Sequence, residues 1–362
     1  MPIKLLICLA LTGLLFQSCH ISTSTRSGAR KAPESIKVVD RERMQEVYEE
    51  IKTPYKYGVV FRHPDTTKAI DSPTIFRMRD QWWMTYIVYD GKGYETWLAE
   101  SPNLLDWQTR GKLLSFTQNT WDANQKAGYL SLVDTRWGGT YQPETYKESY
   151  WMSYLGGASE GYEAGMLGVG MARTKSVIQA REWQRLKEPV LLPTDTEARP
   201  FEDDKIFKSL VIRDTERHTG HPFVMYYNAR TKAGGYESIG MAVSDDMLNW
   251  KRYGQEPIIT RRKGICGDAQ ITKINDLYVM FYFGAFWKPG AFERFACSYD
   301  LIHWTDWEGA DLIAPSEDYD EQYAHKPWVI RWKGTVYHFY NAVGKQGRVI
   351  ALATSKDLRK SK

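Results

Sequence analysis

The sequence predicts an all-β fold: a five-bladed β-propeller that is closed by an N-terminal strand and preceded by one short helix. The first observation is a short aromatic strand that recurs along the chain and ends each time on a tyrosine, with 55 to 73 residues between successive tyrosines. These tyrosines are Tyr86, Tyr154, Tyr227, Tyr282 and Tyr340. A repeat of this size, rich in aromatic and β-favouring residues, is typical of propeller blades.

A second repeat follows the first at the same period. The segments 101–107, 244–250 and 298–304 each begin with Ser, carry Asn or Asp at the third position and end with Trp. An Asn or Asp side chain closes such a turn through its own oxygen, while the Trp packs beneath it. We therefore interpret the aspartates of these turns as structural and not as catalytic.

The two ends of the chain provide the third observation. A strand is expected after each of the first four turns, at 110–114, 186–192, 253–260 and 306–314. The last blade lacks this strand because the chain stops at Lys362. The segment Tyr57–Phe61 can supply it, which closes the ring and removes exposed sheet edges.

The first residues are typical of a targeting segment. Lys4 precedes an apolar run, 5–16, that is too short to span a bilayer, so residues 1–18 are predicted to be a signal peptide. The sequence Phe16-Gln-Ser-Cys19 is similar to a bacterial lipobox, with plain signal cleavage near Cys19 as the alternative. We expect a periplasmic or cell-surface protein, anchored to the bacterial outer membrane only through a lipid on Cys19.

Residues 19–54 are expected to form a tether and a short helix. Residues 20–35 are rich in Ser, Thr, Arg and Gly, as in linkers. The helix is expected over 40–51, with Asp40 as its cap and one apolar face. The propeller domain is then predicted to cover residues 55–362.

The composition of the chain limits the kinds of molecule that we expect it to bind. The formal net charge is +4 and no run of Lys and Arg forms a stripe, so we expect no nucleic-acid partner. Two cysteines of the propeller domain, Cys266 and Cys297, could form a disulfide, but two cysteines alone make no metal site. We expect the protein to be a monomer.

Polar residues begin the innermost strands, where a propeller has its central pocket. Asp71 and His325 lie fifteen residues before the tyrosines of their blades, and Asp268 lies fourteen before its own. The third blade begins with the acidic run 202–204, and the second is expected to begin with 141–144. Carboxylates gathered in an aromatic cavity suit the cleavage of a glycosidic bond, in which one protonates the leaving oxygen and another activates water or attacks the sugar.

A further repeated motif has two interpretations. Gly-Tyr-Glu occurs at 93–95, 161–163 and 235–237, before the third strand of three blades. We favour a repeated hairpin turn, in which Gly adopts a positive φ. The alternative places the glutamates at the rim of the pocket, against sugar hydroxyls.

These motifs resemble those of the five-bladed glycoside hydrolases of family 43 and its clan relatives. The resemblance covers about residues 55–358 and rests on Asp71-Ser-Pro-Thr-Ile, on Tyr141-Gln-Pro-Glu144, on Asp203-Asp-Lys-Ile-Phe, on Asp268-Ala-Gln-Ile-Thr-Lys and on His325. It implies an exo-acting, inverting glycosidase for plant or algal oligosaccharides. In that enzyme Asp71 activates water, Asp268 protonates the leaving oxygen and Asp203 sets the pKa of the proton donor.

Further residues are expected to bind the substrate. The candidates for sugar stacking, hydroxyl binding or pocket lining are Tyr141, Glu144, Asp204, His325, Lys326, Trp287 and His63. The resemblance implies no cofactor, and leaves open a Ca or Na ion held through water beside His325.

Two alternatives stay open at this point. A phosphorylase would need clustered cations for phosphate, and the run 261–263 contains three of them. A non-catalytic sugar-binding propeller is the other alternative, because Asp268 stands where the family carries a longer Glu. Fold alone does not decide among these functions.

Overall fold

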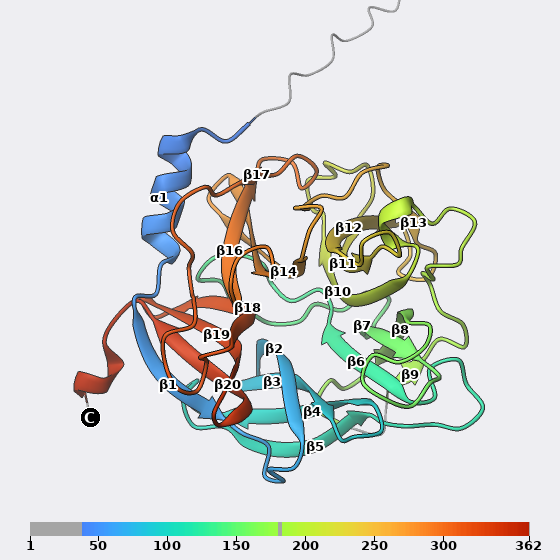
Figure 1. The fold of residues 1–362 in the computed structure, drawn as a ribbon, viewed down its shortest axis with the longest axis horizontal. Coiled ribbons are helices and arrows are strands. Elements are labelled where there is room, and N and C mark those ends of the chain that lie inside the picture. The colour runs from blue at the N-terminus through green and yellow to red at the C-terminus, as the bar shows by residue number, and fades with distance from the viewer. Residues whose placement is uncertain (1–37, 180–182, 362) are drawn as a thin grey trace, which may run out of the picture. The chain divides into compact units, whose positions relative to one another are not determined.

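Residues 38–179 and 183–361 are described by the computed structural model, and their regular secondary structure is almost entirely β-strand, with one α-helix (Figure 1). The signal peptide, Cys19 and most of the tether lie outside the described residues. The first half of the chain forms α1 (Arg41–Ile51), β1 (Tyr55–Phe61), β2 (Ala69–Met78), β3 (Gln81–Tyr89), β4 (Tyr94–Ser101), β5 (Gln108–Leu114), β6 (Gln125–Leu130), β7 (Tyr150–Gly157), β8 (Gly168–Thr174) and β9 (Gln184–Arg185). The second half forms η2 (Pro200–Glu202), β10 (Lys205–Arg213), β11 (Phe223–Arg230), β12 (Glu237–Ser244), β13 (Lys251–Arg252), β14 (Ile265–Ile274), β15 (Leu277–Ala285), β16 (Ala291–Ser298), β17 (Thr305–Asp306), β18 (Tyr323–Trp332), β19 (Thr335–Gly344), β20 (Gly347–Thr354) and η3 (Leu358–Ser361).

The described strands pair in antiparallel groups that follow the chain. The groups are β2–β5, β6–β9, β10–β13, β14–β17 and, last, β18–β20 together with β1. Within each group every strand pairs with the next one along the chain. Figure 1 shows these groups following one another around a common centre. This is the all-β arrangement that the repeats predict.

The pairing of the two chain ends is confirmed. Strand β1 runs antiparallel to β20, with Tyr55 opposite Thr354 and Phe61 opposite Ile350. The first strand of the chain therefore forms the outer edge of the last group, as expected from the missing strand after the fifth repeat.

The helix also forms as predicted. The side chain of Asp40 caps it by accepting a hydrogen bond from the backbone N–H of Arg43 at 2.8 Å. Its buried face carries Met44, Val47 and Ile51, which pack against apolar side chains of β14 to β19. Among the described residues, no helix is long and apolar enough to cross a membrane.

The Ser-to-Trp repeats are structural turns. In the turn at 298–304, the Oδ1 atom of Asp300 accepts hydrogen bonds from the backbone N–H groups of Ile302 and His303 at 2.9 and 2.8 Å. Asn103 and Asp246 do the same in their turns. Each Trp donates its indole N–H to the carbonyl three residues earlier. The interpretation of these acidic residues as turn formers is confirmed.

The repeated tyrosine has a shared buried partner in four of the groups. Its hydroxyl donates to a carboxylate that also pairs with an Arg or Lys. The sets are Tyr154 with Asp122 and Arg185, Tyr227 with Glu202 and Arg199, Tyr282 with Asp306 and Arg261, and Tyr340 with Asp320 and Lys56. In the first group Tyr86 contacts the hydroxyl of Thr109 instead. We call these sets the tyrosine clusters.

Three of the outer strands are shorter than predicted. In the second, third and fourth groups the outer strands β9, β13 and β17 have only two residues each. The predicted segments continue only as isolated bridges, for example Ile239 with Ile259 and Glu293 with Ile313. The short strands β9 and β13 carry Arg185 and Arg252, whose side chains pair with the buried carboxylates of Asp122 and Glu202.

Cys266 and Cys297 are both free and buried. Burial raises the pKa of the Cys266 thiol to about 12. The two cysteines therefore act as small core side chains in β14 and β16, and the disulfide left open by the sequence does not form.

Candidate active site

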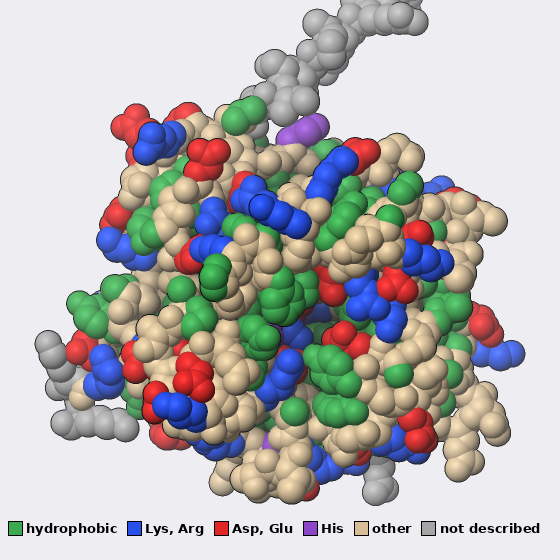
Figure 2. Space-filling model, in the orientation of Figure 1, with side chains coloured by type: hydrophobic (Ala, Val, Ile, Leu, Met, Phe, Trp, Pro, Cys, Tyr) green, Lys and Arg blue, Asp and Glu red, His purple; other side chains and the backbone are tan. Residues whose placement is uncertain are grey.

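One cavity of about 350 Å³ lies between the inner strands of the groups. Figure 2 shows a hollow at the centre of this face, bordered by acidic, basic and hydrophobic side chains. Its ionisable lining residues are Asp71, Glu163, Lys208, Arg230, Glu237, Asp268, His325, Lys326 and Arg348. This is a polar cavity with carboxylates and cations in contact, inside an aromatic wall.

A repeated β-bulge brings these residues into the cavity. The ladder register shifts after Asp71 in β2, after Ile206 in β10, after Gly267 in β14 and after His325 in β18. The extra residue of a bulge bends the strand and re-aims its side chain. Ser72, Asp268 and Lys326 occupy it with φ of 45°, 58° and 63°. Asp268 therefore occupies the same bulge position as Ser72 and Lys326. The positions before the bulge, one residue earlier, are those of Asp71, Gly267 and His325.

Asp71 is buried on the cavity floor and held by two cations. Its Oδ2 atom accepts hydrogen bonds from Lys326 Nζ at 2.8 Å and from Arg348 Nη1 at 2.6 Å. Burial alone would raise the pKa of Asp71, but the charges of Lys326 and Arg348 bring it well below its usual range. Asp71 is therefore a fixed carboxylate and a poor acceptor for a further proton.

Asp268 is held in place by an amide and a hydroxyl. Its Oδ1 accepts from Asn228 Nδ2 at 2.8 Å, and its backbone N–H donates to Asn228 Oδ1 at 2.7 Å. Its Oδ2 accepts from Ser72 Oγ at 3.3 Å and lies 3.4 Å from Lys208 Nζ. Lys208 is 3% exposed, and its ammonium has no hydrogen-bond partner among the described residues. An ammonium left in this state offers its N–H groups to a ligand in the cavity.

His325 is neutral. Its buried ring places Nδ1 2.9 Å from the carbonyl oxygen of Asn341, so Nδ1 carries the proton and donates it. Burial, and next the charge of Lys326, lower the pKa of His325 to about 3. Its Nε2 atom is therefore an acceptor.

The surroundings of His325 do not suit a bound metal ion. Lys326 and Arg348 already supply positive charge there, and the described residues contain no group of three or more His, Cys, Asp or Glu side chains that could hold a metal.

Two glutamates complete the cavity wall. Glu237 is the first residue of β12, and Glu163 follows β7 with φ of 48°. Within residues 38–179 and 183–361, the Glu237 carboxyl forms no hydrogen bond or ion pair, whereas Glu163 Oε1 accepts from Tyr94 at 3.4 Å. Burial, and next the charge of Glu163, raise the pKa of Glu237 to about 8, against the opposing charge of Arg230. A carboxylic acid thus faces the cavity at neutral pH beside a second carboxyl group.

Comparison with known proteins decides the family. No protein-family model and no curated protein matches the chain. Among solved structures, a glycoside hydrolase is 49% identical to the chain with a TM-score of 0.85, over 88% of this chain and 96% of that protein. The chain belongs to the glycoside hydrolases.

Other structures agree. The protein in a BT0996 RGII complex is 48% identical with a TM-score of 0.85, over 88% of this chain and 96% of that protein. A thermostable family-43 glycoside hydrolase is 15% identical with a TM-score of 0.60, over 82% and 91% of the two proteins, and shows the shared propeller fold alone. The predicted family resemblance and glycosidase activity are confirmed.

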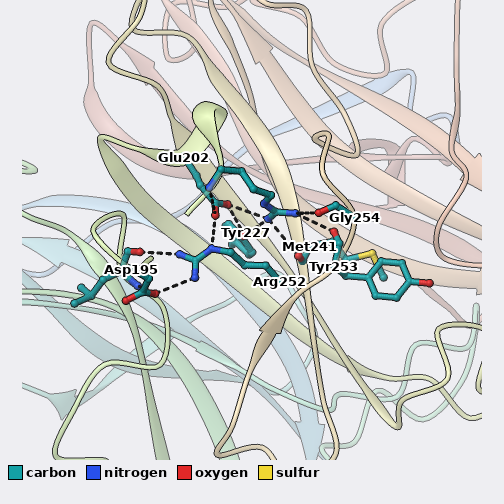
Figure 3. A network of polar contacts seen from close by, with 9 residues as sticks. Asp195, Glu202, Tyr227, Met241, Arg252, Tyr253 and Gly254 are labelled. Atoms are coloured by element: carbon teal, nitrogen blue, oxygen red, sulfur yellow. Dashed lines mark hydrogen bonds and ion pairs between the residues drawn. The ribbon is translucent and has the colours of Figure 1, made fainter. Parts of the chain in front are cut away.

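The acidic run that opens the third group of this glycoside hydrolase lies outside the cavity. Figure 3 shows Glu202 beside Arg252 and Tyr227 in a buried network, with Arg252 also paired to Asp195 at 2.9 Å. Glu202 pairs with Arg199 as well, at 2.9 Å. This corrects the expected position of the pocket-facing residue, which the bulge moves to Phe207 and Lys208.

The predicted positions of Asp203 and Asp204 in the cavity are corrected in the same way. Asp203 Oδ1 accepts the backbone N–H of Lys232 at 2.8 Å and does not line the cavity. Asp204 Oδ2 accepts from Arg230 Nε at 2.6 Å, so it contacts the cavity only through Arg230.

Asp203 and Asp268 should therefore respond differently to the same substitution. We expect Asp203→Asn to keep kcat/KM within about twofold, since it alters a backbone contact outside the cavity. Asp268→Asn removes a charged partner from the cavity and should lower kcat/KM about 10- to 100-fold, as expected for hydrogen bonds to a charged group. Steady-state kinetics on one substrate measures both, and an equal loss in both variants would contradict this assignment.

The second group of strands also begins at a different segment from the predicted one, 141–144. Its inner strand is β6, and Tyr141 and Glu144 lie in the long connection 131–149 between β6 and β7. Tyr141 is buried, and its hydroxyl donates to the carbonyl of Arg331 at 3.1 Å. Glu144 pairs with Arg213 at 2.8 Å outside the cavity. Both residues stabilise contacts away from the cavity lining.

His63 and Trp287 likewise lie outside the cavity lining. His63 Nδ1 accepts the backbone N–H of Asp65 at 3.0 Å, and its ring packs on Trp97. Trp287 donates its indole N–H to the carbonyl of Ile265 at 3.1 Å and packs on Phe292. Local packing accounts for both side chains, in place of the expected sugar contacts.

Two cavity residues belong to the Gly-Tyr-Glu motif, for which the turn was favoured. Gly161 and Gly235 have the positive φ of that turn, and Glu163 and Glu237 also line the cavity, as in the rim alternative. Glu95, the third member, is buried and pairs with Lys112 at 2.9 Å. Lys208 lies within the bulge of β10, between Ile206 and Ser209, and the inner strands β2, β14 and β18 have the same bulge. Arg348 is the second residue of β20, and no sequence pattern marks it.

Proposed function

We propose that this glycoside hydrolase removes a terminal sugar from an oligosaccharide, with Glu237 as the proton donor. The observation that carries the proposal is the unpartnered carboxyl of Glu237 in the cavity wall, with its pKa raised to about 8 by burial and by Glu163. A carboxylic acid kept protonated near neutral pH beside a second carboxyl is the arrangement that glycoside hydrolysis needs.

Each carboxyl then has one task. Glu237 donates its proton to the glycosidic oxygen as the bond to the leaving sugar breaks. Glu163 takes the proton of an attacking water, or attacks the anomeric carbon itself. Asp71 and Asp268, to which the sequence assigned these two roles, are better placed to bind sugar hydroxyls, because their oxygens are held by cations, an amide and a hydroxyl. Lys208 and neutral His325 supply a donor and an acceptor beside them.

The expected substrate is the end of a plant or algal oligosaccharide. A cavity of about 350 Å³ is near the lower limit of ligand pockets, about 300–1,000 Å³, so it suits the end of a sugar polymer better than its middle. The relative studied in a BT0996 RGII complex makes an RGII oligosaccharide the first substrate to test.

Sugar release from an RGII oligosaccharide tests the proposal, with ¹H NMR of the first product reporting the anomer. Inversion, as the sequence predicts, gives the anomer opposite to the substrate linkage. Turnover that strictly requires phosphate would instead indicate a phosphorylase. The cations at 261–263 give that alternative no support, because they lie outside the cavity, where Arg261 pairs with Asp306. Binding without turnover would contradict the proposal.

The pH dependence of kcat/KM should report Glu237. Its pKa is raised from its ordinary value to about 8, so the proton is present below pH 8 and is lost as the pH rises through that value. We therefore expect kcat/KM to fall tenfold per pH unit above about pH 8. The matched control is a glycosyl fluoride of the same sugar, whose leaving group needs no proton, and this alkaline limb should be absent for it. The same limb for both substrates would contradict the assignment.

We also propose the finer architecture and location that the sequence predicts. Five four-stranded groups of antiparallel pairs support a five-bladed propeller. A functional monomer is part of the same proposal. The lipobox-like sequence supports export and lipidation at Cys19 on the outer membrane. Radiolabelled palmitate should be incorporated in the unmodified protein and not in Cys19→Ser.

A further inference from the structure

Two aromatic side chains at the cavity are left open to solvent. Tyr162 is 47% exposed and Phe286 is 63% exposed, and both line the cavity. Of the other Tyr and Phe side chains in the lining, Tyr323 is half-buried, and Tyr94, Tyr129, Phe207 and Phe283 are buried. Exposed aromatic surface at the border of a cavity marks a site that something else covers.

Phe286 is held in place at a conformational cost. Its φ of 65° is in the left-handed region, which costs a residue other than Gly about 1–3 kcal/mol. Its ring packs edge-on against Tyr323, with 6.0 Å between the ring centroids. The next residue, Trp287, is anchored on Ile265 by its indole N–H. The exposed position of Phe286 is therefore set by its neighbours, and strain of this kind is common at ligand sites.

Tyr162 is equally constrained. Its ring makes edge contacts with Tyr89 and Tyr94, at centroid distances of 5.4 and 5.8 Å. Arg348 lies over the ring at 5.7 Å and donates to its hydroxyl at 3.4 Å. A ring fixed in this way loses little entropy when a ligand packs against it.

The cavity is polar where it is buried and aromatic where it is exposed. Asp71, Lys208 and Asp268 are at most 5% exposed, and they present the donors and acceptors that sugar hydroxyls need. The proton donor Glu237 is half-buried. Since the terminal sugar occupies the buried end, the sugar that leaves must occupy the exposed one.

We propose that Tyr162 and Phe286 form a stacking platform for the leaving-group sugar, the unit beyond the cleaved bond. This proposal rests on the proposed function and extends it to the other side of that bond. The ligand it requires is a sugar ring that presents an apolar C–H face to an aromatic ring. The enzyme would then select oligosaccharides over small glycosides of the same terminal sugar.

The test compares two substrates that share the terminal sugar. One is an RGII oligosaccharide, and the other is the fluoride of its terminal sugar, whose leaving group cannot stack. We expect Phe286→Ala to lower kcat/KM about tenfold for the oligosaccharide and to leave the fluoride within about twofold. Phe286→Tyr should restore the oligosaccharide rate. Leu248→Ala, an exposed apolar side chain in the turn 244–250, is the matched control with no effect.

Binding separates this proposal from the proposed function. Calorimetric titration in the inactive Glu237→Gln background should show a Kd about tenfold weaker with Phe286→Ala for the oligosaccharide, and an unchanged Kd for the free terminal monosaccharide. Equal losses for both ligands, no loss for either, or no binding of the oligosaccharide would overturn the platform. A wild-type protein that releases no sugar, while the Kd difference persists, would refute the proposed function and leave the platform supported.

Discussion

Replacing Glu237 by Gln should lower kcat/KM for an oligosaccharide about 10³-fold, the scale of general acid catalysis. The amide keeps the size of the side chain but has no proton to donate to the leaving oxygen. The Glu237 carboxyl makes no hydrogen bond or ion pair among the described residues, so its replacement breaks no contact that holds the fold. We therefore expect an unchanged melting temperature together with the kinetic loss.

The leaving group provides a second measurement for the same variant. Glycosyl fluorides need no protonation, so the loss in Glu237→Gln should shrink to about tenfold or less for them. Glu144→Gln is the matched control, because it makes the same chemical change at a carboxyl that pairs with Arg213 outside the cavity. An equal loss for both substrates would mean that Glu237 acts in binding and not as the acid.

Replacing Asp122 by Ala should destabilise the protein by about 3–5 kcal/mol, the cost of leaving a buried charge without its partner. Asp122 is fully buried, accepts from the Tyr154 hydroxyl at 2.9 Å and pairs with Arg185. The ammonium of Lys126, also fully buried, lies 3.9 Å from it. Burial lowers the pKa of Lys126 to about 8, so Asp122 is the group that favours its charge.

Differential scanning calorimetry measures this effect as a melting temperature lowered by roughly 6–15 °C. Asp122→Asn keeps a partner for Tyr154 and should fall between Ala and the unmodified protein. Asp80→Ala is the control, because the Asp80 side chain is 90% exposed in its pair with Arg77 and should contribute at most about 1 kcal/mol. A similar melting temperature for Asp122→Ala and Asp80→Ala would contradict the role of the tyrosine clusters.

The fold was predictable because its repeats are local. The tyrosine strand and the Ser-to-Trp turn each depend on residues close together in the chain, so their spacing survives in the sequence. Cavity residues were predictable only in groups where the inner strand begins a constant number of residues before the repeated tyrosine. Counting back from the tyrosine reaches Asp71 and His325, but it fails in the second group because the connection 131–149 is long, and in the third because the bulge turns Lys208 inward and not Asp203.

The proposed catalytic pair could not be derived from sequence for a different reason. Glu163 and Glu237 share a motif with Glu95, and only the fold turns two of the three toward the cavity. The raised pKa of Glu237 depends on burial and on Glu163, which comes from a different group of strands. Neither effect is visible in the order of residues.

The last tyrosine cluster has a consequence for synthesis of the chain. Tyr340 and Asp320 belong to the end of the chain, whereas their cation, Lys56, lies in β1. Strand β1 is made before every other described strand and has no strand partner until β20 has been made, so it is an open edge for all that time. The final group can pair its buried acidic residue with Lys56 only when β1 reaches β20, so the first and last of the described strands mature together.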